Sequence, residues 1–237
     1  MRPLQYKSQY INLRVDISQR MSTETAISDS NTHMVSIHSY LSGISNSTEK
    51  NRIAGLMRRN GYSRSDAVAL SKAFHGKANI RQCQRAVAAI IDLQAYNNNL
   101  QNYCDTYLGL DCSGFINCYF KDTHGLSERT ISSYYQRGRR RLRTHFEDFR
   151  SKDVLIWCDN HGTINSGGGR AQHIAVIDRV RELCAENMEA VVVESTGTVG
   201  LVHSTYTFFR TRTPGVYRVH RPLKPTTNNH VKIVPVV

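Results

Sequence analysis

Short apolar runs separated by turn residues fill the second half of the sequence, and they limit the fold more than any other feature. Four of these runs are rich in β-branched residues: "DVLIWC" (153–158), "QHIAVIDRV" (172–180), "AVVVEST" (190–196) and "GVYRVHR" (215–221). Short runs of this composition, bounded by turn residues, predict strands. We expect them to form an antiparallel sheet.

The part of the chain before these runs, from about residue 48 to residue 97, has a helical pattern instead. Ile53 and Met57 recur at helical spacing, and Gly61 ends that segment. Ser63 and Asp66 resemble a capping box that starts a second helix, and a third helix follows. Helices that precede the strands, rather than alternating with them, predict an α+β fold with N-terminal helices packed on the sheet.

These patterns divide the chain into four parts. Residues 1–46 are polar, with only "YINLRVDI" having the alternation of a strand, and we expect an N-terminal arm that is partly mobile or wraps around the body. A helical part (47–100) and a core (101–222) follow, and residues 223–237 are expected to form a surface extension. The glycine-rich stretch "DNHGTINSGGGRAQ" lacks the residue order of a phosphate-binding motif, so we expect a flexible loop there.

The charge balance favours polyanionic partners. The formal net charge is +12 at pH 7, the isoelectric point is about 9.6, and the densest basic cluster is "RGRRRLR" (137–143). A nucleic acid, an anionic membrane surface or an acidic cell-wall polymer would each be attracted to such a protein. A solvated face is the alternative interpretation of the arginine cluster.

No segment of the sequence has the features of a membrane span or of a secretion signal. The longest apolar stretches are too short to cross a bilayer, and the N-terminus has no apolar core of signal-peptide length. We therefore expect synthesis in the cytoplasm without a signal peptide. Action outside the cell would then require a different export route.

Six cysteines, at positions 83, 104, 112, 118, 158 and 184, could serve disulfides, metal binding, packing or catalysis. Disulfides need an oxidising compartment, of which the sequence gives no sign. A zinc site of Cys104, Cys112, Cys118 and His124 fits no usual ligand spacing, so no metal or other cofactor is expected. Most of the other cysteines are expected to be packing residues, and Cys184 is included among them.

Cys112 differs from the other cysteines because it follows a helix-capping residue. In "YLGLDCSGFINCYF", Asp111 is a good N-cap, which puts Cys112 in the first turn of a helix that runs to Phe120. The positive end of a helix favours thiolate over thiol and lowers the pKa of the cysteine. Backbone N–H groups near Cys112 and Ser113 can also hold a developing oxyanion. These features predict a nucleophile, with a small buried packing residue as the alternative.

A cysteine nucleophile needs a base, and His173 is the histidine best placed to act as one. It begins the strand "HIAVI", so we expect its side chain at a sheet edge that faces the predicted helix. Glu194 lies among valines of the next strand, would be costly to bury unpaired, and could accept a hydrogen bond from the imidazole. A symmetric hairpin pairing these two residues would turn near Leu183, ahead of the turn-forming residues. Ser195 or Thr196 is therefore the alternative for the third role.

The order of these motifs resembles the NlpC/P60 family of papain-like cysteine hydrolases. The resemblance rests on "LDCSGFINCYF … LSERTISSYYQ … KDVLIWC … QHIAVIDRV … AVVVEST" and covers roughly residues 100 to 222. It implies a papain-like fold with the nucleophile at a helix N-terminus. It also implies a peptidase or amidase that cuts peptide stems of peptidoglycan without a metal ion.

The resemblance also assigns roles to individual residues. Cys112 corresponds to the nucleophile and His173 to the base, while the third position, usually His, Asn or Gln in the family, is occupied by Glu194. An upstream tyrosine often binds substrate in the family, and Tyr103 and Tyr107 are both candidates here. The usual Gly-Gly stretch near that tyrosine is missing, and the long loop before His173 is a second departure.

The leading hypothesis is therefore a cysteine amidohydrolase that cleaves peptidoglycan stem peptides through an acyl-thioester. Such an enzyme would be delivered by a secretion system or released by phage lysis, as an antibacterial toxin or lysis enzyme. It would act in the periplasm or cell wall of a target cell. Its partners would be the peptidoglycan peptide and an immunity or inhibitor protein.

Two alternatives keep other chemistry open. The first is a papain-like protease, deamidase or acyltransferase that acts on proteins or lipids of a host cell, because a fold does not fix its function. The second is a nucleic-acid-binding module in residues 48–97, where two predicted helices flank a glycine turn near Arg58, Arg59 and Arg64. No recognition-helix signature accompanies these arginines, so no stable nucleic-acid complex is expected.

Overall fold

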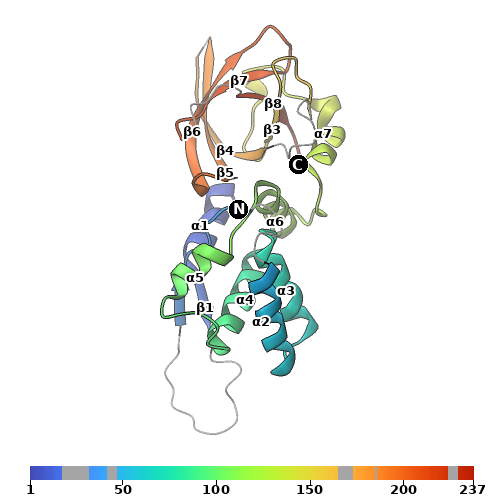
Figure 1. Cartoon of the computed structure of the whole chain (residues 1–237). Helices are drawn as coiled ribbons and strands as arrows, with labels where there is room; N and C mark the ends of the chain where they lie inside the picture. Colours follow the sequence, from blue (N-terminus) through green and yellow to red (C-terminus); the bar gives the residue numbers. More distant parts are fainter. Residues whose placement is uncertain (18–31, 42–46, 165–172, 185, 224–228) are drawn as a thin grey trace.

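A closed antiparallel barrel forms one end of the molecule in the computed structural model of the chain (Figure 1). The structure describes residues 1–17, 32–41, 47–164, 173–184, 186–223 and 229–237. The barrel strands, in their order around the barrel, are β3 (Val154–Cys158), β4 (Ile174–Leu183), β5 (Asn187–Thr196), β6 (Gly200–Arg210), β7 (Tyr217–His220) and β8 (His230–Val234). β8 pairs with β3, and this pairing closes the barrel.

Strand β3 and the first part of β4, up to Ile177, are buried on both faces, which explains why their sequences are apolar there. Leu155 and Ala175 belong to a cluster with the aromatic residues of the barrel interior. Their neighbours Val154, Ile156 and Ile174 point to the other face and belong to a second cluster, shared with the helices. Successive residues of a strand point to opposite faces, so each run supplies two cores at once.

The helices are α1 (Pro3–Ile11), α2 (Ser47–Arg59), α3 (Arg64–Phe74), α4 (Ile80–Asp92), α5 (Leu100–Tyr107), α6 (Cys112–His124) and α7 (Ile131–Gly138). Figure 1 shows α2, α3 and α4 at the end of the molecule away from the barrel, with α6 between them and the strands. Capping boxes start α3, at Ser63 and Asp66, and α4, at Asn79 and Gln82. The fold is thus mixed helix and sheet, while its assignment as papain-like stays a prediction.

None of the helices in the described part of the chain is both long and apolar enough to cross a membrane.

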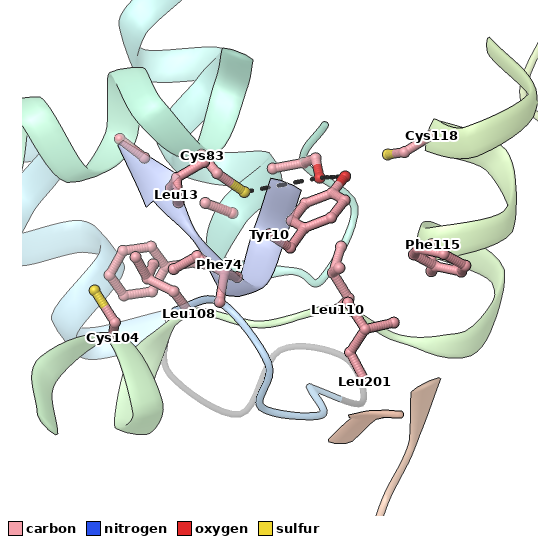
Figure 2. Close-up of a cluster of buried hydrophobic side chains, with 14 of the residues drawn as sticks. Tyr10, Leu13, Phe74, Cys83, Cys104, Leu108, Leu110, Phe115, Cys118 and Leu201 are labelled. Carbon is pink, nitrogen blue, oxygen red and sulfur yellow. Dashed lines mark hydrogen bonds between the residues drawn. The ribbon is translucent and has the colours of Figure 1, made fainter. Parts of the chain in front are cut away.

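The N-terminal residues are built into the core, although the sequence analysis expected a polar arm. α1 and the two-stranded sheet of β1 (Leu13–Asp16) and β2 (Thr32–Val35) precede the helical part. Figure 2 shows Tyr10 and Leu13 among core side chains, where the Tyr10 hydroxyl donates a hydrogen bond to the carbonyl of Ala78 at 3.0 Å. The helix was missed because polar residues fill one side of α1, while Tyr6 and Tyr10, one turn apart, are buried on the other.

The tail of the chain also differs from its expected role. Instead of a surface extension, residues 230–234 form β8, which pairs with β3 on one side and with β7 on the other. The valines and isoleucine of "HVKIV" alternate with polar residues, which is a strand signal that the nearby prolines obscured. β6 and the helices α5 and α7 are three further elements that the sequence analysis did not name.

Two bulges set the register of β4 against β5. Val176 pairs with Val193, but the register has shifted twice by the point where Leu183 pairs with Met188. Each shift adds one residue to β4, so the hairpin is not symmetric. Continuing the register of Val176 makes His173 and Glu194 diagonal neighbours on one face of the ladder. The predicted conflict between their contact and the position of the turn therefore does not arise.

None of the six cysteines, all of which lie in the described part of the chain, forms a disulfide, and five of the six are buried. Cys83, Cys104 and Cys118 lie in the cluster drawn in Figure 2, where they act as small apolar side chains. Cys184 is exposed beyond the end of β4, so its expected packing role is wrong. It was misjudged because the strand continues past the barrel core into an exposed hairpin end.

Candidate functional site

Cys112 is the first residue of α6, and the residue before it accounts for this position. Asp111 has an extended backbone, and its side chain accepts a hydrogen bond from the amide of Gly114 at 2.5 Å. The sulfur of Cys112 accepts hydrogen bonds from the backbone amides of Ser113 and Ile174. Ile174 is the first residue of β4 and follows His173 directly. The start of the helix and the start of the strand therefore meet at the sulfur.

The Cys112 thiol is held in its protonated form. Burial raises its pKa to about 11, and the negative charge of Asp111 acts in the same direction. The amides of Ser113 and Ile174 and the Lys77 ammonium lower the pKa, but by less than burial raises it. The predicted lowering by the helix N-terminus is therefore wrong for the substrate-free protein. The capping carboxylate and the removal of solvent outweigh the favourable backbone dipoles.

His173 and Glu194 are in direct contact. The imidazole Nε2 lies 2.5 Å from Glu194 Oε2, and the side chains are 20% and 2% exposed, respectively. The indole of Trp157, on β3, packs edge-on against the imidazole with ring centroids 4.5 Å apart. The structure thus brings together the predicted base and the predicted third residue, with an aromatic ring beside the base.

Glu194 is held by three donors at the barrel interior. Besides His173, Arg221 donates from Nη2 to Glu194 Oε2 at 2.6 Å, and the Tyr206 hydroxyl donates to Oε1. Burial alone would raise the pKa of Glu194, but its bond and charge interaction with His173, the charge of Arg221 and the bond from Tyr206 hold that pKa below its usual value. Glu194 is therefore an ionised carboxylate that only accepts hydrogen bonds.

This carboxylate fixes the tautomer of the neutral imidazole. Because Glu194 can only accept, Nε2 of His173 carries the hydrogen, and Nδ1 is the basic nitrogen. A histidine in this state can take a proton at Nδ1 while its Nε2–H bond to the carboxylate keeps the ring in place. The arrangement supplies a thiol, an oriented base and a buried counter-charge for the imidazolium.

A second polar network surrounds the first turn of α6. Lys77 lies in the loop between α3 and α4, and its Nζ is 2.5 Å from Asp111 Oδ2 and 2.6 Å from Ser113 Oγ. Ser113 Oγ donates in turn to Asp111 Oδ1 at 3.0 Å. Ser113, predicted for oxyanion binding, thus lies at the site, with its hydroxyl engaged and its amide directed at the sulfur.

The two tyrosines predicted to bind substrate have contacts elsewhere. The Tyr103 hydroxyl donates to Glu49 on α2 at 2.7 Å, and its ring packs on that of Tyr107 with centroids 4.8 Å apart. The Tyr107 ring also packs on Phe74 of α3. A different tyrosine, Tyr40, lies near the site and interacts electrostatically with Cys112 and Asp111. Burial raises the pKa of its phenol, and the negative charge of Asp111, with that of Cys112 once the thiol ionises, raises this pKa further.

Tyr40 reaches the site on an irregular segment, residues 36–41, that is wedged between the helices and the barrel. The Leu110 amide donates to the Ser39 carbonyl at 2.9 Å, and the Leu201 amide donates to the His38 carbonyl at 2.6 Å. A β-carbon at Gly109 would lie 2.2 Å from the Ser39 carbonyl oxygen, so only glycine permits this approach. The local sequence of Tyr40 carries no signal of its role, because these contacts bridge distant parts of the chain.

Ser195, an alternative for the third role, has a contact of its own. Ser195 donates its hydroxyl to the Leu110 carbonyl at 2.6 Å and so supports the segment before α6 rather than the imidazole. Within the described residues, no group of three His, Cys, Asp or Glu side chains could hold a metal ion. The glycine-rich stretch expected to form a loop lies, from residue 165 to residue 172, outside the described residues.

Arg221 and Tyr206 are the members of the site that sequence reasoning missed. Arg221 directly follows β7, and Tyr206 lies on β6, the strand that pairs with the β5 strand of Glu194. The one available signal was an arginine at the end of the apolar run "GVYRVHR".

Comparisons with protein-family models, with curated proteins and with solved structures find no match to this chain.

Proposed function

We propose that the protein is a cysteine amidohydrolase or endopeptidase that cleaves amide bonds through an acyl-thioester on Cys112. The observation that carries the proposal is the position of Cys112 at the start of β4, next to the contact between His173 and Glu194. The Cys112 sulfur lies at the amide of Ile174, and the preceding residue, His173, contacts the buried Glu194 at 2.5 Å. A thiol, an imidazole and a carboxylate in this order are the parts needed for acyl transfer.

Proton transfer to His173 accompanies attack in the proposed mechanism. With a pKa of about 11, a free Cys112 thiolate at pH 7 would cost about 5 kcal/mol. His173 therefore takes the proton at Nδ1 as the sulfur bonds to the substrate carbonyl carbon, and Glu194 stabilises the resulting imidazolium. The amide nitrogen is expelled after it receives that proton from His173.

Water completes the cycle. His173, neutral again, removes a proton from a water molecule that attacks the thioester carbon, and the carbon–sulfur bond breaks with return of the proton to Cys112. In both steps the negative oxygen is stabilised by backbone N–H groups at the start of α6, near Cys112 and Ser113. Tyr40 is a candidate for contact with the substrate, since it lies close enough to Cys112 for a charge on the sulfur to raise the pKa of its phenol.

The proposed substrate is the peptide stem of peptidoglycan. This choice is supported by the resemblance of "LDCSGFINCYF" and the following motifs to the NlpC/P60 family, and by the net charge of +12, which favours acidic wall polymers. Delivery by a secretion system or by phage, action in the periplasm or cell wall, and an inhibitor protein belong to the same proposal. A host-cell protein or lipid is the alternative substrate class.

Digestion of purified peptidoglycan tests the proposal. The wild-type protein is expected to release cleaved stem peptides detectable by mass spectrometry. Cys112→Ala should abolish cleavage, and His173→Ala should reduce it at least about 100-fold, because general-base catalysis contributes at least that factor. Cys184→Ala is the matched control, since this exposed thiol should be dispensable. Equal product profiles for wild type and Cys112→Ala would refute the proposal.

A groove in the helical part of the molecule favours a second candidate function, which is nucleic-acid binding. Arg64, Arg81 and Arg85 are exposed and line a groove of about 510 Å³ between α3 and α4, with no carboxylate in its lining. Guanidinium groups suit phosphate oxygens, so the groove fits a nucleic-acid backbone. The 137–143 cluster is a weaker candidate, because Arg143 is bound to Asp153 at 2.9 and 3.1 Å.

A further inference from the structure

Among the described residues, Arg221 is a charged group in direct contact with the His173–Glu194 pair that the proposed mechanism does not use. Its side chain is 9% exposed, and its Nη2 donates to Glu194 Oε2 at 2.6 Å. The same oxygen receives His173 Nε2 at 2.5 Å. One carboxylate oxygen is therefore shared between a permanent cation and an imidazole that must become a cation during catalysis.

The guanidinium is fixed by more than this ion pair. Its Nε donates to the Tyr206 hydroxyl at 2.9 Å, and Tyr206 donates to the other oxygen of Glu194. The guanidinium carbon also lies 4.9 Å from the Trp157 ring centroid and 5.8 Å from that of Tyr206. Bonds on two sides and two aromatic faces leave it little freedom, so the carboxylate is held in one orientation.

We propose that Arg221 is a positioning residue that clamps Glu194 against His173 and offsets its charge, so that the resting site is a neutral thiol beside a neutral imidazole. This inference rests on the proposed role of Cys112 and His173. A carboxylate without a second cation would stabilise the imidazolium strongly and would favour transfer of the Cys112 proton before substrate arrives. Arg221 weakens that bias and keeps the sulfur unreactive until an amide occupies the site.

Among the described residues, the following titratable groups lie around His173 and Cys112. Glu194 contacts the imidazole, and Tyr206 and Arg221 bind Glu194. Asp111 and Lys77 flank the thiol at the start of α6, and Tyr40 approaches it from residues 36–41. Lys77 and Asp111 are paired with each other, so Arg221 and Glu194 set the charge felt by the imidazole.

Alkylation of Cys112 by iodoacetamide, followed across pH by peptide mass spectrometry, tests the clamp without any substrate. A Cys184→Ser background removes the exposed thiol. Arg221→Gln should raise the alkylation rate at pH 7 about tenfold, because loss of the cation favours the thiolate–imidazolium pair. Arg221→Lys keeps the charge and should stay within about threefold of the parent. Arg218→Gln is the matched control, since Arg218 lies on β7 but is exposed.

The pH profile of peptide cleavage gives the second readout. Arg221→Gln should move the acid limb of kcat/KM about one unit to higher pH, since a better stabilised imidazolium loses its proton later. A purely structural role would lower the rate without moving the limb. Tyr206→Phe keeps the ion pair and should leave the limb in place. If Arg221→Gln folds poorly, Tyr206→Phe and Arg221→Lys serve as the second variants.

The outcomes separate this inference from the proposed function. A tenfold rise in alkylation with no cleavage of peptidoglycan would support the clamp and refute the substrate. Unchanged or slower alkylation in a folded Arg221→Gln variant, with an unmoved acid limb, would overturn the clamp even if the protein cleaves peptidoglycan. An alkylation profile that His173→Ala leaves unchanged would overturn both, because the imidazole would then not act on the thiol.

Discussion

At the residue scale, the burial of Cys112 couples catalysis to stability. Its thiol has a pKa of about 11 in the folded protein, whereas an unfolded cysteine titrates near about 8.5. Between these two values the unfolded chain loses the proton while the folded protein keeps it. Folding stability therefore falls as the pH rises through this window and is unaffected by this group below it.

This coupling predicts a measurable effect of Cys112→Ala. From pH 8 to pH 10.5, the wild-type protein should lose about 2–3 kcal/mol more of its unfolding free energy than the variant. Urea unfolding at both pH values measures the difference, and Cys184→Ala serves as the exposed-thiol control. Other buried cysteines contribute equally to both proteins. Parallel pH dependences of wild type and Cys112→Ala would contradict the buried thiol.

At the scale of elements, the first turn of α6 is placed by a close backbone approach. A β-carbon at Gly114 would lie 1.9 Å from the carbonyl oxygen of Gly76, in the loop before α4. The same Gly76 carbonyl accepts a hydrogen bond from the Asp111 amide at 3.1 Å. Because residue 114 is glycine, the first turn of α6 can pack directly against the loop that carries Lys77. This packing places the Lys77 ammonium next to Asp111.

Gly114→Ala is therefore expected to destabilise the protein and displace the site. We expect a loss of about 3 kcal/mol, because the obstructing atom is backbone and cannot turn away. Gly55→Ala, at a half-buried position in the middle of α2, is the matched control. There the nearest atom is the end of the Arg59 side chain at 3.9 Å, so a gain of about 0.5–1 kcal/mol is expected. Thermal unfolding compares the two, and equal effects would contradict the close packing.

The sequence predicted those elements whose signals are local. Asp111 predicts the start of α6, and the apolar runs predict β3, β4, β5 and β7. The helix that carries Cys112 and the strand that follows His173 were therefore both expected. Barrel closure was not, because it depends on pairing β8 with β3, which lie far apart in the chain. Tyr40 and Arg221 join the site only through contacts between distant parts of the chain, and Tyr206 joins it through the β5–β6 hairpin.

At the scale of the whole molecule, the basic surface is divided between two ends. The groove of Arg64, Arg81 and Arg85 lies among the helices, whereas Arg140 and Arg141 are exposed on the short helical turn after α7. α2, α3 and α4 lie away from the barrel (Figure 1), and the lining of the groove includes none of the residues that contact Cys112 or His173. The two surfaces can therefore be tested separately.

Charge reversal distinguishes the groove from the cluster. If the helical part binds nucleic acid, Arg81→Glu with Arg85→Glu should abolish low-salt retention of labelled DNA or RNA. Arg140→Glu with Arg141→Glu, which makes the same charge change, should have little effect. Wild-type binding should weaken steeply as salt increases. No retention by the wild type at low salt, or equal losses in both variants, would refute the second function.

The position of Trp157 gives this protein an internal optical probe. It is the only tryptophan in the sequence, and its ring touches the imidazole of His173 on one side and the guanidinium of Arg221 on the other. Indole emission responds to charges beside the ring. Every fluorescence signal excited selectively at tryptophan therefore comes from the candidate site. Proton uptake by His173, or arrival of a substrate, can thus be followed in real time on unlabelled protein.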